Sequence, residues 1–221
     1  MLESHLTNGQ HFELLTDIPI LAMSDTMRDL GLSLGNSTTE HGLIGFGDPM
    51  PTKIHSELIY HKNLVPYFML GCVQAAIEGG STVIYDAVKA AQIVSDEEPA
   101  LLGVTMVYHA EHYEDTKAVV PLIRKKRGEE FLAFRQKKFE LNEVRNLPEH
   151  WNEEDFYTYV DTVMSRSKEF DRVLAPGEVI LVDNYKTLHE RTAYDGIRKI
   201  IRVRVDDPDS NKKYLMNPEG I

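Results

Sequence analysis

Three side chains with the chemistry of metal ligands lie at two separated places in this 221-residue sequence. His55 and Glu57 are one residue apart, and His189 follows the apolar segment 178–182. Side chains at positions i and i+2 of a strand leave from the same face, so a strand here would point both ligands at one ion. Two histidines and a carboxylate on one face of an octahedral ion leave room for a chelating cosubstrate and dioxygen. The pattern predicts a non-haem Fe(II) site, although zinc accepts the same ligands.

Each half of this site also has a plain structural interpretation. His55 and Glu57 could lie on the solvent face of a surface strand, because a two-residue motif is common by chance. His189 could be a corner histidine that bonds to the backbone. If the three side chains do not converge, the chain would be a non-catalytic binding or scaffold protein on a β-sandwich, since a fold does not determine a function.

Arginines follow His189 at a spacing that suits a carboxylate ligand. Arg198 and Arg202 are four residues apart, so on a strand they share a face, and Arg204 shares it too. Guanidinium groups bind carboxylates bidentately, so this strand could hold an anionic cosubstrate beside the metal. The alternative is that the arginines form a solvent-exposed face opposite an apolar one. The order of metal histidine, short loop and arginine strand favours the binding site.

A double glycine precedes a threonine in the segment Glu78-Gly-Gly-Ser-Thr82. Such a segment is most often only a hairpin turn. Beside the arginine strand, however, the hydroxyl of Thr82 can donate a hydrogen bond to the carboxylate that Arg198 holds.

The composition is that of an ordinary globular protein with an acidic surface. Lysine and arginine number 24 against 35 aspartates and glutamates, a net charge of −11, which argues against nucleic acid or an anionic membrane as a partner and leaves a small-molecule substrate. The single cysteine, Cys72, excludes an intrachain disulfide. The apolar run 64–77 is too short to span a bilayer, and the N-terminal residues lack a signal-peptide pattern. We therefore expect a cytoplasmic protein with a single domain over residues 1–221, in an oligomeric state that the sequence leaves open.

Hydrophobic periodicity and turn residues predict about eight strands and two or three helices. Helices are expected at 24–29, 86–94 and 151–166, with Ser24, Asp86 and Asn152 as their N-caps. Residues 33–52 are rich in Gly, Ser, Thr and Pro, which predicts a loop, and residues 55–60 are expected as a strand. The pattern indicates a mainly β fold with supporting helices, either a sandwich or a barrel.

Other polar clusters are less specific. Residues 109–112 contain two histidines and a glutamate without the spacing of a zinc-protease helix, and the basic run 124–127 is typical of a solvated hairpin turn. Tyr60, His61, Tyr85 and Asp86 flank the candidate site, where they could either contact a substrate amine or pack.

At these positions the chain resembles the clavaminate synthase-like and taurine dioxygenase-like branch of the Fe(II)/2-oxoglutarate-dependent oxygenases. The likeness rests on His55-Ser-Glu57, on Gly79–Thr82 and on the long segment Pro176–Arg202, and the last is highly specific. It covers residues 50–90 and 174–206, while residues 1–45 and 95–170 match no pattern that we can name.

The resemblance implies a double-stranded β-helix, the jelly-roll or cupin-like fold, with Fe(II) bound by His55, Glu57 and His189. It also implies that Arg198, helped by Thr82, binds the distal carboxylate of 2-oxoglutarate, and that Arg202 binds the anionic group of the substrate. The family reaction uses dioxygen to decarboxylate 2-oxoglutarate to succinate. The resulting oxidant removes hydrogen from an unactivated C–H bond and usually returns hydroxyl.

Two residues refine what the resemblance implies. Glu57 stands where Asp is commoner, and in this branch Glu is frequent among enzymes that act on free amino acids; it also argues against a halogenase. The implied reaction is hydroxylation of a small carboxylate, a free amino acid or a derivative, in the setting of natural-product biosynthesis. Desaturation, cyclisation and rearrangement share the oxidant and stay open as alternatives. Glu190 departs from the glycine that the family often has after this histidine.

Overall fold

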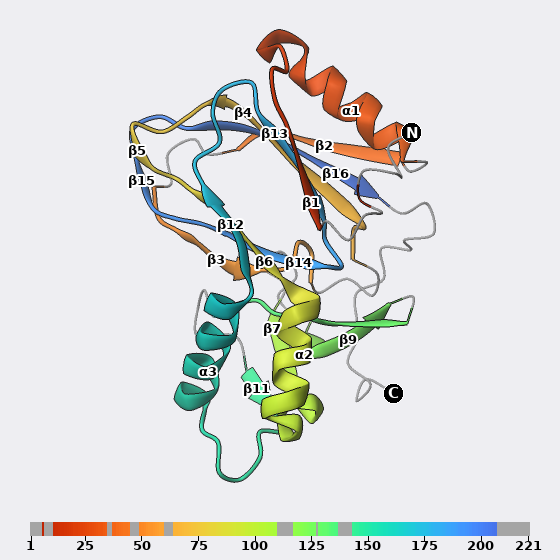
Figure 1. The fold of residues 1–221 in the computed structure, drawn as a ribbon, viewed down its shortest axis with the longest axis vertical. Coiled ribbons are helices and arrows are strands. Elements are labelled where there is room, and N and C mark those ends of the chain that lie inside the picture. The colour runs from red at the N-terminus through yellow and green to blue at the C-terminus, as the bar shows by residue number, and fades with distance from the viewer. Residues whose placement is uncertain are drawn as a thin grey trace.

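Two antiparallel sheets form the body of the computed structural model, which describes residue 6 and residues 11–34, 37–44, 49–59, 64–109, 117–126, 128–136 and 143–206 (Figure 1). The larger sheet runs in the order β1 (Phe12–Leu15), β13 (Val179–Asp183), β4 (Tyr67–Gln74), β16 (Lys199–Asp206) and β2 (Ser37–Ile44). The smaller sheet runs in the order β12 (Lys168–Arg172), β6 (Thr82–Asp86), β14 (Thr187–Arg191) and β3 (Thr52–His55).

Helices and short strands surround these sheets. The helices are α1 (Met23–Ser33), α2 (Ala87–Glu97) and α3 (Glu153–Arg166), with short 3-10 turns η2 (Ile20–Ala22) and η3 (Pro99–Gly103). The further strands are β5 (Glu78–Gly79) with β15 (Tyr194–Asp195), β9 (Ile123–Lys126) with β10 (Glu129–Leu132), and β11 (Glu143–Arg145), β7 (Thr105–His109) and β8 (Lys117–Pro121). Within the ranges given above, no helix combines the length and the apolar character needed to cross a bilayer.

An apolar layer fills part of the space between the two sheets. Phe68 and Ile180 of the larger sheet pack with Ile84 of the smaller one, and each of the three is fully buried. Because successive side chains of a strand point to opposite faces, each sheet also has an outer face to cover. Two facing antiparallel sheets with helices outside confirm the predicted mainly β, jelly-roll architecture with supporting helices.

Helix α1 covers the outer face of the larger sheet. Met23 and Met27 are fully buried against Met69 and Val203 of that sheet. A Cβ atom on Gly71 would lie 2.6 Å from the Met23 sulfur and 2.7 Å from the Met27 sulfur. The glycine therefore lets the helix approach the sheet closely.

Helices α2 and α3 cover the outer face of the smaller sheet. Tyr85 and Leu188 point into this layer and pack in one cluster with Ala90 of α2 and Phe156 of α3. The opposite face of the same strands is turned toward the larger sheet and carries His189 and Thr82. The alternation of side chains along β6 and β14 thus points the predicted site residues into the space between the sheets. The helices α2 and α3 pack on the other face of these strands.

Several element predictions are confirmed and others are wrong. The Asp86 side chain caps α2 by accepting hydrogen bonds from the backbone N–H groups of the first turn, and Asn152 caps α3 in the same way. Ser24 is not a cap, because α1 begins after Ala22 without a side-chain cap bond. Residues 33–52 are not all loop, since β2 lies within them and pairs with β16. A partner strand far along the chain outweighs the local composition there.

Candidate metal centre and its pocket

The two histidines of the predicted site are cross-strand neighbours. His55 ends β3, and His189 lies in the middle of β14, with the two residues directly opposite each other in the antiparallel register. Their ring centroids are 4.2 Å apart. The structure therefore brings the two separated sequence motifs together, which contradicts the alternative in which they lie on unrelated surfaces.

Glu57 reaches the same point from a turn rather than from a strand. The expectation that residues 55–60 form a strand is wrong, because β3 ends at His55 and residues 57–59 form a turn. Leu58 has a positive φ of 53°, which takes the chain out of the extended conformation immediately after Glu57. The two ligands thus converge without the strand alternation that the sequence implied.

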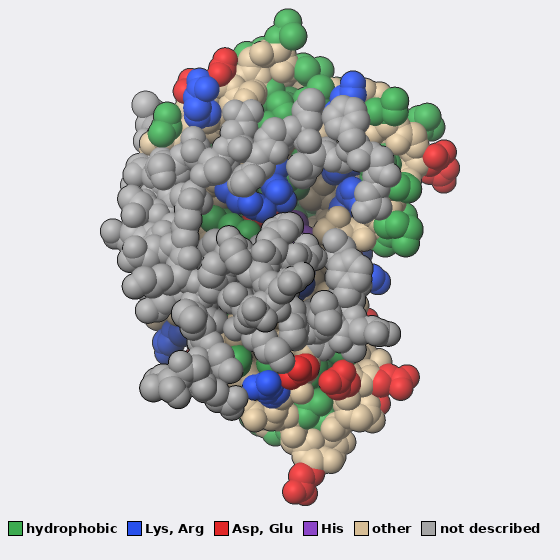
Figure 2. Space-filling model, turned by 180° about the vertical axis from the view of Figure 1, so that it is seen from behind, with side chains coloured by type: hydrophobic (Ala, Val, Ile, Leu, Met, Phe, Trp, Pro, Cys, Tyr) green, Lys and Arg blue, Asp and Glu red, His purple; other side chains and the backbone are tan. Residues whose placement is uncertain are grey.

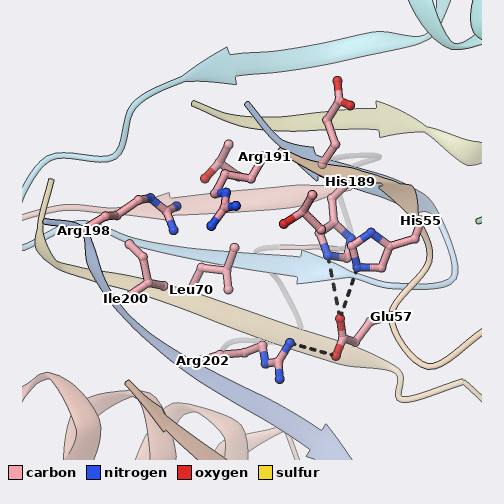
Figure 3. A pocket seen from close by; sticks show the side chains of 11 residues that line it. His55, Glu57, Leu70, His189, Arg191, Arg198, Ile200 and Arg202 are labelled. Atoms are coloured by element: carbon pink, nitrogen blue, oxygen red, sulfur yellow. Dashed lines mark ion pairs between the residues drawn. The ribbon is translucent and has the colours of Figure 1, made fainter. Parts of the chain in front are cut away.

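The distances between the donor atoms suit a single metal ion (Figure 3). Nε2 of His55 lies 3.7 Å from Oε2 of Glu57, and Nε2 of His189 lies 3.8 Å from the same oxygen. Nitrogen and oxygen ligands bind such ions at about 2.0–2.2 Å, so one ion can reach all three atoms. These three residues form one of two groups of possible metal ligands among the described residues.

Charge in this group matches what metal ligation requires. Burial lowers the pKa of His189 well below its usual value, and the neighbouring His55 lowers it further, so the imidazole is neutral. Burial raises the pKa of the Glu57 carboxyl, but the adjacent His55 and the charges of Arg202 and Arg204 lower it by more. The Glu57 pKa is therefore well below its usual range, and the group is a carboxylate.

The ring of His55 is held in the tautomer that a metal needs. Its Nδ1 lies 2.7 Å from the backbone carbonyl oxygen of Lys53. A carbonyl can only accept, so Nδ1 carries a proton, and Nε2 is the nitrogen that faces Glu57 and is placed to bind a metal. His189 is packed instead against Phe68, at 4.5 Å between ring centroids. Its Nδ1 is buried without a hydrogen-bond partner among the described residues.

Two arginines of β16 face the other oxygen of Glu57. Nη1 of Arg202 lies 3.4 Å from Oε1, and Arg204 contacts the same oxygen through Nε and Nη2. The interpretation of this strand face as solvent-exposed is wrong, because Arg202 and Arg204 point between the sheets while Val203 packs against α1. Arg204 has no assigned role in the sequence analysis, although its parity with Arg202 predicted the shared face.

A cavity of about 210 Å³ opens beside the three ligands. The apolar residues that line it are Leu70 and Ile200. The polar and charged residues are Thr52, His55, Glu57, Thr82, His189, Glu190, Arg191, Arg198 and Arg202. In the space-filling view, basic side chains and a histidine lie at the bottom of a hollow (Figure 2). The predicted cosubstrate and substrate residues therefore share one pocket with the metal ligands.

Arg198 and Thr82 lie at the buried side of this pocket. Arg198 is 6% exposed, and burial, reinforced by the charge of Arg191, lowers its pKa to about 10, which still leaves it protonated at neutral pH. Oγ1 of Thr82 is buried and has no hydrogen-bond partner among the described residues. A buried hydroxyl without a partner is costly, so an acceptor from a bound ligand would satisfy it.

Gly80 lies against the side chain of Arg198. Its φ is +75°, a conformation that favours glycine, and an added Cβ would lie 3.3 Å from Cδ of Arg198. The second glycine of the predicted turn therefore also leaves space for the side chain of Arg198.

Glu190 is among the residues that line the cavity, but its carboxylate pairs with Tyr85 on the face that the helices cover. The Tyr85 hydroxyl donates a short hydrogen bond to Oε1 of Glu190. Burial and this bond raise the Tyr85 pKa far above its usual value, so the phenol stays protonated. The charged residue in place of the family glycine is therefore accommodated by a buried donor, and Tyr85 packs rather than facing a substrate.

Arg191 is a pocket residue that the sequence analysis did not single out. Its side chain lies over the ring of Tyr194 at 4.8 Å and donates a hydrogen bond to the backbone carbonyl of Met50. Its parity with His189 on β14 could have predicted its place on the inner face.

The other polar residues noted in the sequence are not among the described residues that line this cavity. The side chain of His109, and Tyr60, His61, Glu111 and His112 as a whole, lie outside the described residues. Residues 124–126 of the basic run lie in strand β9, which pairs with β10, and not in a turn. Arg124 is also not solvated, since burial lowers its pKa and it lies 6.0 Å from the Phe131 ring centre. A second group of possible ligands consists of His11 just before β1, Glu169 of β12 and Asp86, which already serves as the cap of α2.

Comparison with known proteins agrees with this geometry. The family described as "Taurine catabolism dioxygenase TauD, TfdA family" matches residues 26–204. No curated protein sequence matches the chain.

Solved structures share the fold at low sequence identity. PvcB from Pseudomonas aeruginosa has a TM-score of 0.73 and 14% identity over 98% of this chain and 81% of its own. Asparagine oxygenase in complex with Fe(II), 3-hydroxyasparagine and succinate has a TM-score of 0.56 and 20% identity over 72% of this chain and 50% of its own. The iron oxygenase OrfP with Fe and L-Arg has a TM-score of 0.61 and 11% identity over 97% of this chain and 83% of its own.

Proposed function

This chain belongs to the taurine catabolism dioxygenase TauD, TfdA family, and on that basis we propose that it hydroxylates an unactivated C–H bond of a small carboxylate, a free amino acid or a close derivative of one. Family membership makes it an enzyme, an Fe(II)- and 2-oxoglutarate-dependent dioxygenase, as the sequence predicted. The non-catalytic scaffold interpretation is thereby set aside. The assignment of individual residues, the substrate class and the outcome of the reaction are the parts that we propose.

Iron is assigned to His55, Glu57 and His189. The supporting observation is that two imidazole nitrogens and one carboxylate oxygen lie within 4.8 Å of one another beside a cavity. Two histidines and one carboxylate leave coordination positions for a chelating cosubstrate and dioxygen. When bound, iron and 2-oxoglutarate supply the oxidising chemistry, in which decarboxylation of the cosubstrate to succinate is coupled to attack on a C–H bond.

The distal carboxylate of 2-oxoglutarate is assigned to Arg198 and Thr82. A largely buried guanidinium needs an anion, and the hydroxyl of Thr82 lacks an acceptor among the described residues. Both line the cavity that contains the metal ligands. A carboxylate between them would satisfy the buried charge and the buried donor together.

The anionic group of the substrate is assigned to Arg202. Its side chain is 25% exposed and lines the cavity, so an incoming ligand can reach it. Arg204 contacts the same Glu57 oxygen, and it therefore remains as a partner of the carboxylate when Arg202 turns to the substrate. A substrate carboxylate held on Arg202 would place the adjoining carbon chain near the metal.

A free amino acid suits this pocket because the lining offers a partner for its carboxylate and for its carbon chain. Its carboxylate matches Arg202, and its short carbon chain matches the apolar Leu70 and Ile200 of the lining. Structural neighbours bound to 3-hydroxyasparagine and to L-Arg show that the fold accommodates such ligands elsewhere. Desaturation, cyclisation or rearrangement of the same substrate remains the alternative outcome.

A mass-spectrometric screen tests the proposal. Purified protein is incubated with Fe(II), 2-oxoglutarate and each free amino acid, and both succinate and substrate-derived products are measured. Hydroxylation adds about 16 mass units, and desaturation or ring closure removes about 2. Succinate formation that is coupled to one amino acid and gives the heavier product supports the proposal. Succinate formation that no amino acid or derivative stimulates would contradict the substrate class.

A further inference from the structure

The backbone of Glu57 is not held by a sheet. β3 ends at His55, so the N–H and C=O of Glu57 lack the ladder partners that a strand would supply. Buried backbone polar groups nevertheless need partners. The side chain of Asn184, which is fully buried, provides both.

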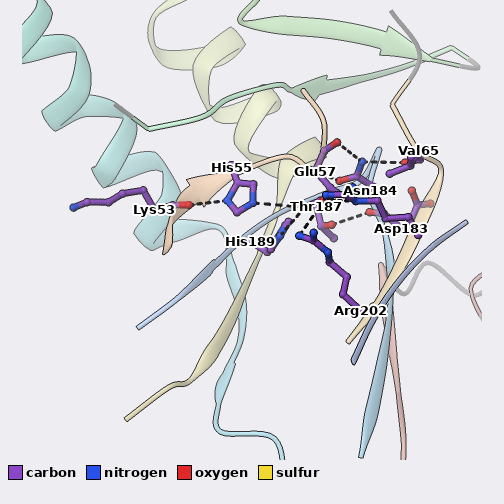
Figure 4. A network of polar contacts seen from close by, with 10 residues as sticks. Lys53, His55, Glu57, Val65, Asp183, Asn184, Thr187, His189 and Arg202 are labelled. Atoms are coloured by element: carbon purple, nitrogen blue, oxygen red, sulfur yellow. Dashed lines mark hydrogen bonds and ion pairs between the residues drawn. The ribbon is translucent and has the colours of Figure 1, made fainter. Parts of the chain in front are cut away.

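Asn184 forms three hydrogen bonds through its side-chain amide (Figure 4). Its Oδ1 accepts from the backbone N–H of Glu57 at 2.9 Å, and its Nδ2 donates to the carbonyl of Glu57 at 3.0 Å. Nδ2 also donates to the carbonyl of Val65 at 2.9 Å. One side chain thus fixes the peptide groups on both sides of the Glu57 Cα, and the direction in which the carboxylate leaves the backbone.

The amide itself is placed by the hairpin that carries His189. Asn184 lies in the turn between β13 and β14, and its backbone N–H donates to the carbonyl of Pro66 at 2.9 Å. Asp183 shapes this turn by accepting a hydrogen bond from the backbone N–H of Tyr185. The group that locates Glu57 is therefore built on the same hairpin as one of the two histidines.

The conformation at Leu58 shows why such a clamp is needed. Its φ of 53° lies in the left-handed region, which a residue with a branched side chain adopts only when its surroundings enforce it. The turn would relax toward an extended conformation without an outside constraint, and the carboxylate would then leave the point that the histidines share. The hydrogen bonds of Asn184 lie directly before this residue.

We propose that Asn184 is a positioning residue, which sets the place of the Glu57 carboxylate relative to His55 and His189 through the Glu57 backbone. The inference rests on the proposed metal site. Asn184 does not touch the metal position, because its polar atoms are occupied by Glu57 and Val65. Its loss should weaken metal binding more than it weakens the fold.

Tyr185 provides a matched control. Its hydroxyl donates to the carbonyl of Leu64 at 3.0 Å, so it joins the same hairpin to the same neighbouring segment without contacting Glu57. Tyr185→Phe removes that hydrogen bond and keeps the aromatic ring, which packs against Phe131. A general loosening of the hairpin would affect both variants, whereas a positioning role belongs to Asn184 alone.

The experiment titrates Co(II) into wild-type protein, Asn184→Ala and Tyr185→Phe, and follows the visible absorption that reports ligand geometry. Wild-type binding is measured first, because its absence would contradict the iron site and not the role of Asn184. Groups that orient metal ligands are typically worth about 10–100-fold in metal affinity, and we expect a loss of that size with an altered spectrum in Asn184→Ala. Tyr185→Phe should bind Co(II) as the wild type does.

Hydrogen exchange of the metal-free proteins gives a second readout. The backbone amide of Glu57 should exchange faster in Asn184→Ala than in wild type. In Tyr185→Phe its exchange rate should equal that of the wild type. If Asn184→Ala does not fold, Asn184→Ser is used, because its shorter hydroxyl cannot bridge both backbone groups of Glu57. Equal loss of Co(II) affinity in the Asn184 and Tyr185 variants, or wild-type affinity in the Asn184 variant, would overturn the proposal.

Discussion

Nη1 of Arg202 lies 3.4 Å from Oε1 of Glu57, so the arginine assigned to the substrate also faces the carboxylate assigned to iron. Arg198, in contrast, lies deeper in the pocket, and the described side chains that pair with the Glu57 carboxylate are His55, His189, Arg202 and Arg204. The two arginines of the motif therefore have different surroundings, and their substitution should have different effects.

Arg198→Ala should weaken 2-oxoglutarate binding by about 10–100-fold, since a charge-assisted hydrogen bond to a carboxylate is worth about 1.5–3 kcal/mol. Arg202→Ala should leave that affinity nearly intact and instead abolish the stimulation of succinate formation by substrate. Calorimetric titration with 2-oxoglutarate and coupled turnover assays separate the two effects. An exchange of the two phenotypes would reverse the roles of the arginines.

Thr82→Val should reduce 2-oxoglutarate affinity about fivefold, which corresponds to about 1 kcal/mol for one hydrogen bond. The fold should be unaffected, because Oγ1 of Thr82 has no partner among the described residues and valine has the same shape. Thr187→Val is the matched control, since the Thr187 hydroxyl donates to the carbonyl of Asp183 at 2.8 Å. Thr187→Val should be less stable than the wild type and bind 2-oxoglutarate with the same affinity. If Thr82→Val binds 2-oxoglutarate as tightly as the wild type, Thr82 is not part of the 2-oxoglutarate site.

Arg204→Met should destabilise the metal-free protein by about 1–3 kcal/mol, because a buried carboxylate loses a charged partner. Added Co(II) should restore part of this loss, since a bound cation supplies the missing positive charge beside Glu57. Urea unfolding with and without the metal measures both quantities. A loss of stability that the metal does not change would show that Arg204 serves the fold and not the Glu57 carboxylate.

Gly80→Ala should cost about 1–2 kcal/mol of folding free energy, because the left-handed φ disfavours any Cβ. It should also weaken 2-oxoglutarate binding, because the new methyl group would crowd Cδ of Arg198. Gly128→Ala, where φ is +90° and an added Cβ meets no atom within 4 Å, is the control for strain alone. Equal 2-oxoglutarate affinity in both variants would mean that Gly80 has only a conformational role.

The sequence predicts the identity of the site residues better than the way they are held. His55, Glu57 and His189 are found by residue type and spacing. The cross-strand register of the two histidines was not predicted, because His189 lies in β14, which was not expected as a strand, and β3 ends at His55, where the predicted strand begins. The turn at Glu57 could not be predicted, because its partner is an amide 127 residues away in the chain. A short sequence pattern around Glu57 carries no information about a hydrogen bond to a residue so distant in the chain.

The same limit applies to the arginine strand and to β2. The parity of Arg202 and Arg204 is visible in the sequence, but their burial depends on a second sheet that faces them. Residues 37–44 have a loop-like composition and form a strand because β16 offers them an edge. The mainly β class and the helix caps Asp86 and Asn152 were predictable, because alternation and capping are local properties.

The central claim, an iron site formed by His55, Glu57 and His189, is tested most directly by measuring iron content together with 2-oxoglutarate turnover. Wild-type protein, His55→Ala and His189→Ala are loaded with Fe(II) under anaerobic conditions and then assayed for succinate in air. We predict that the wild type holds one iron per chain and forms succinate, and that each substitution removes most of both. Iron content and succinate formation that stay at the wild-type level in both variants would contradict the account.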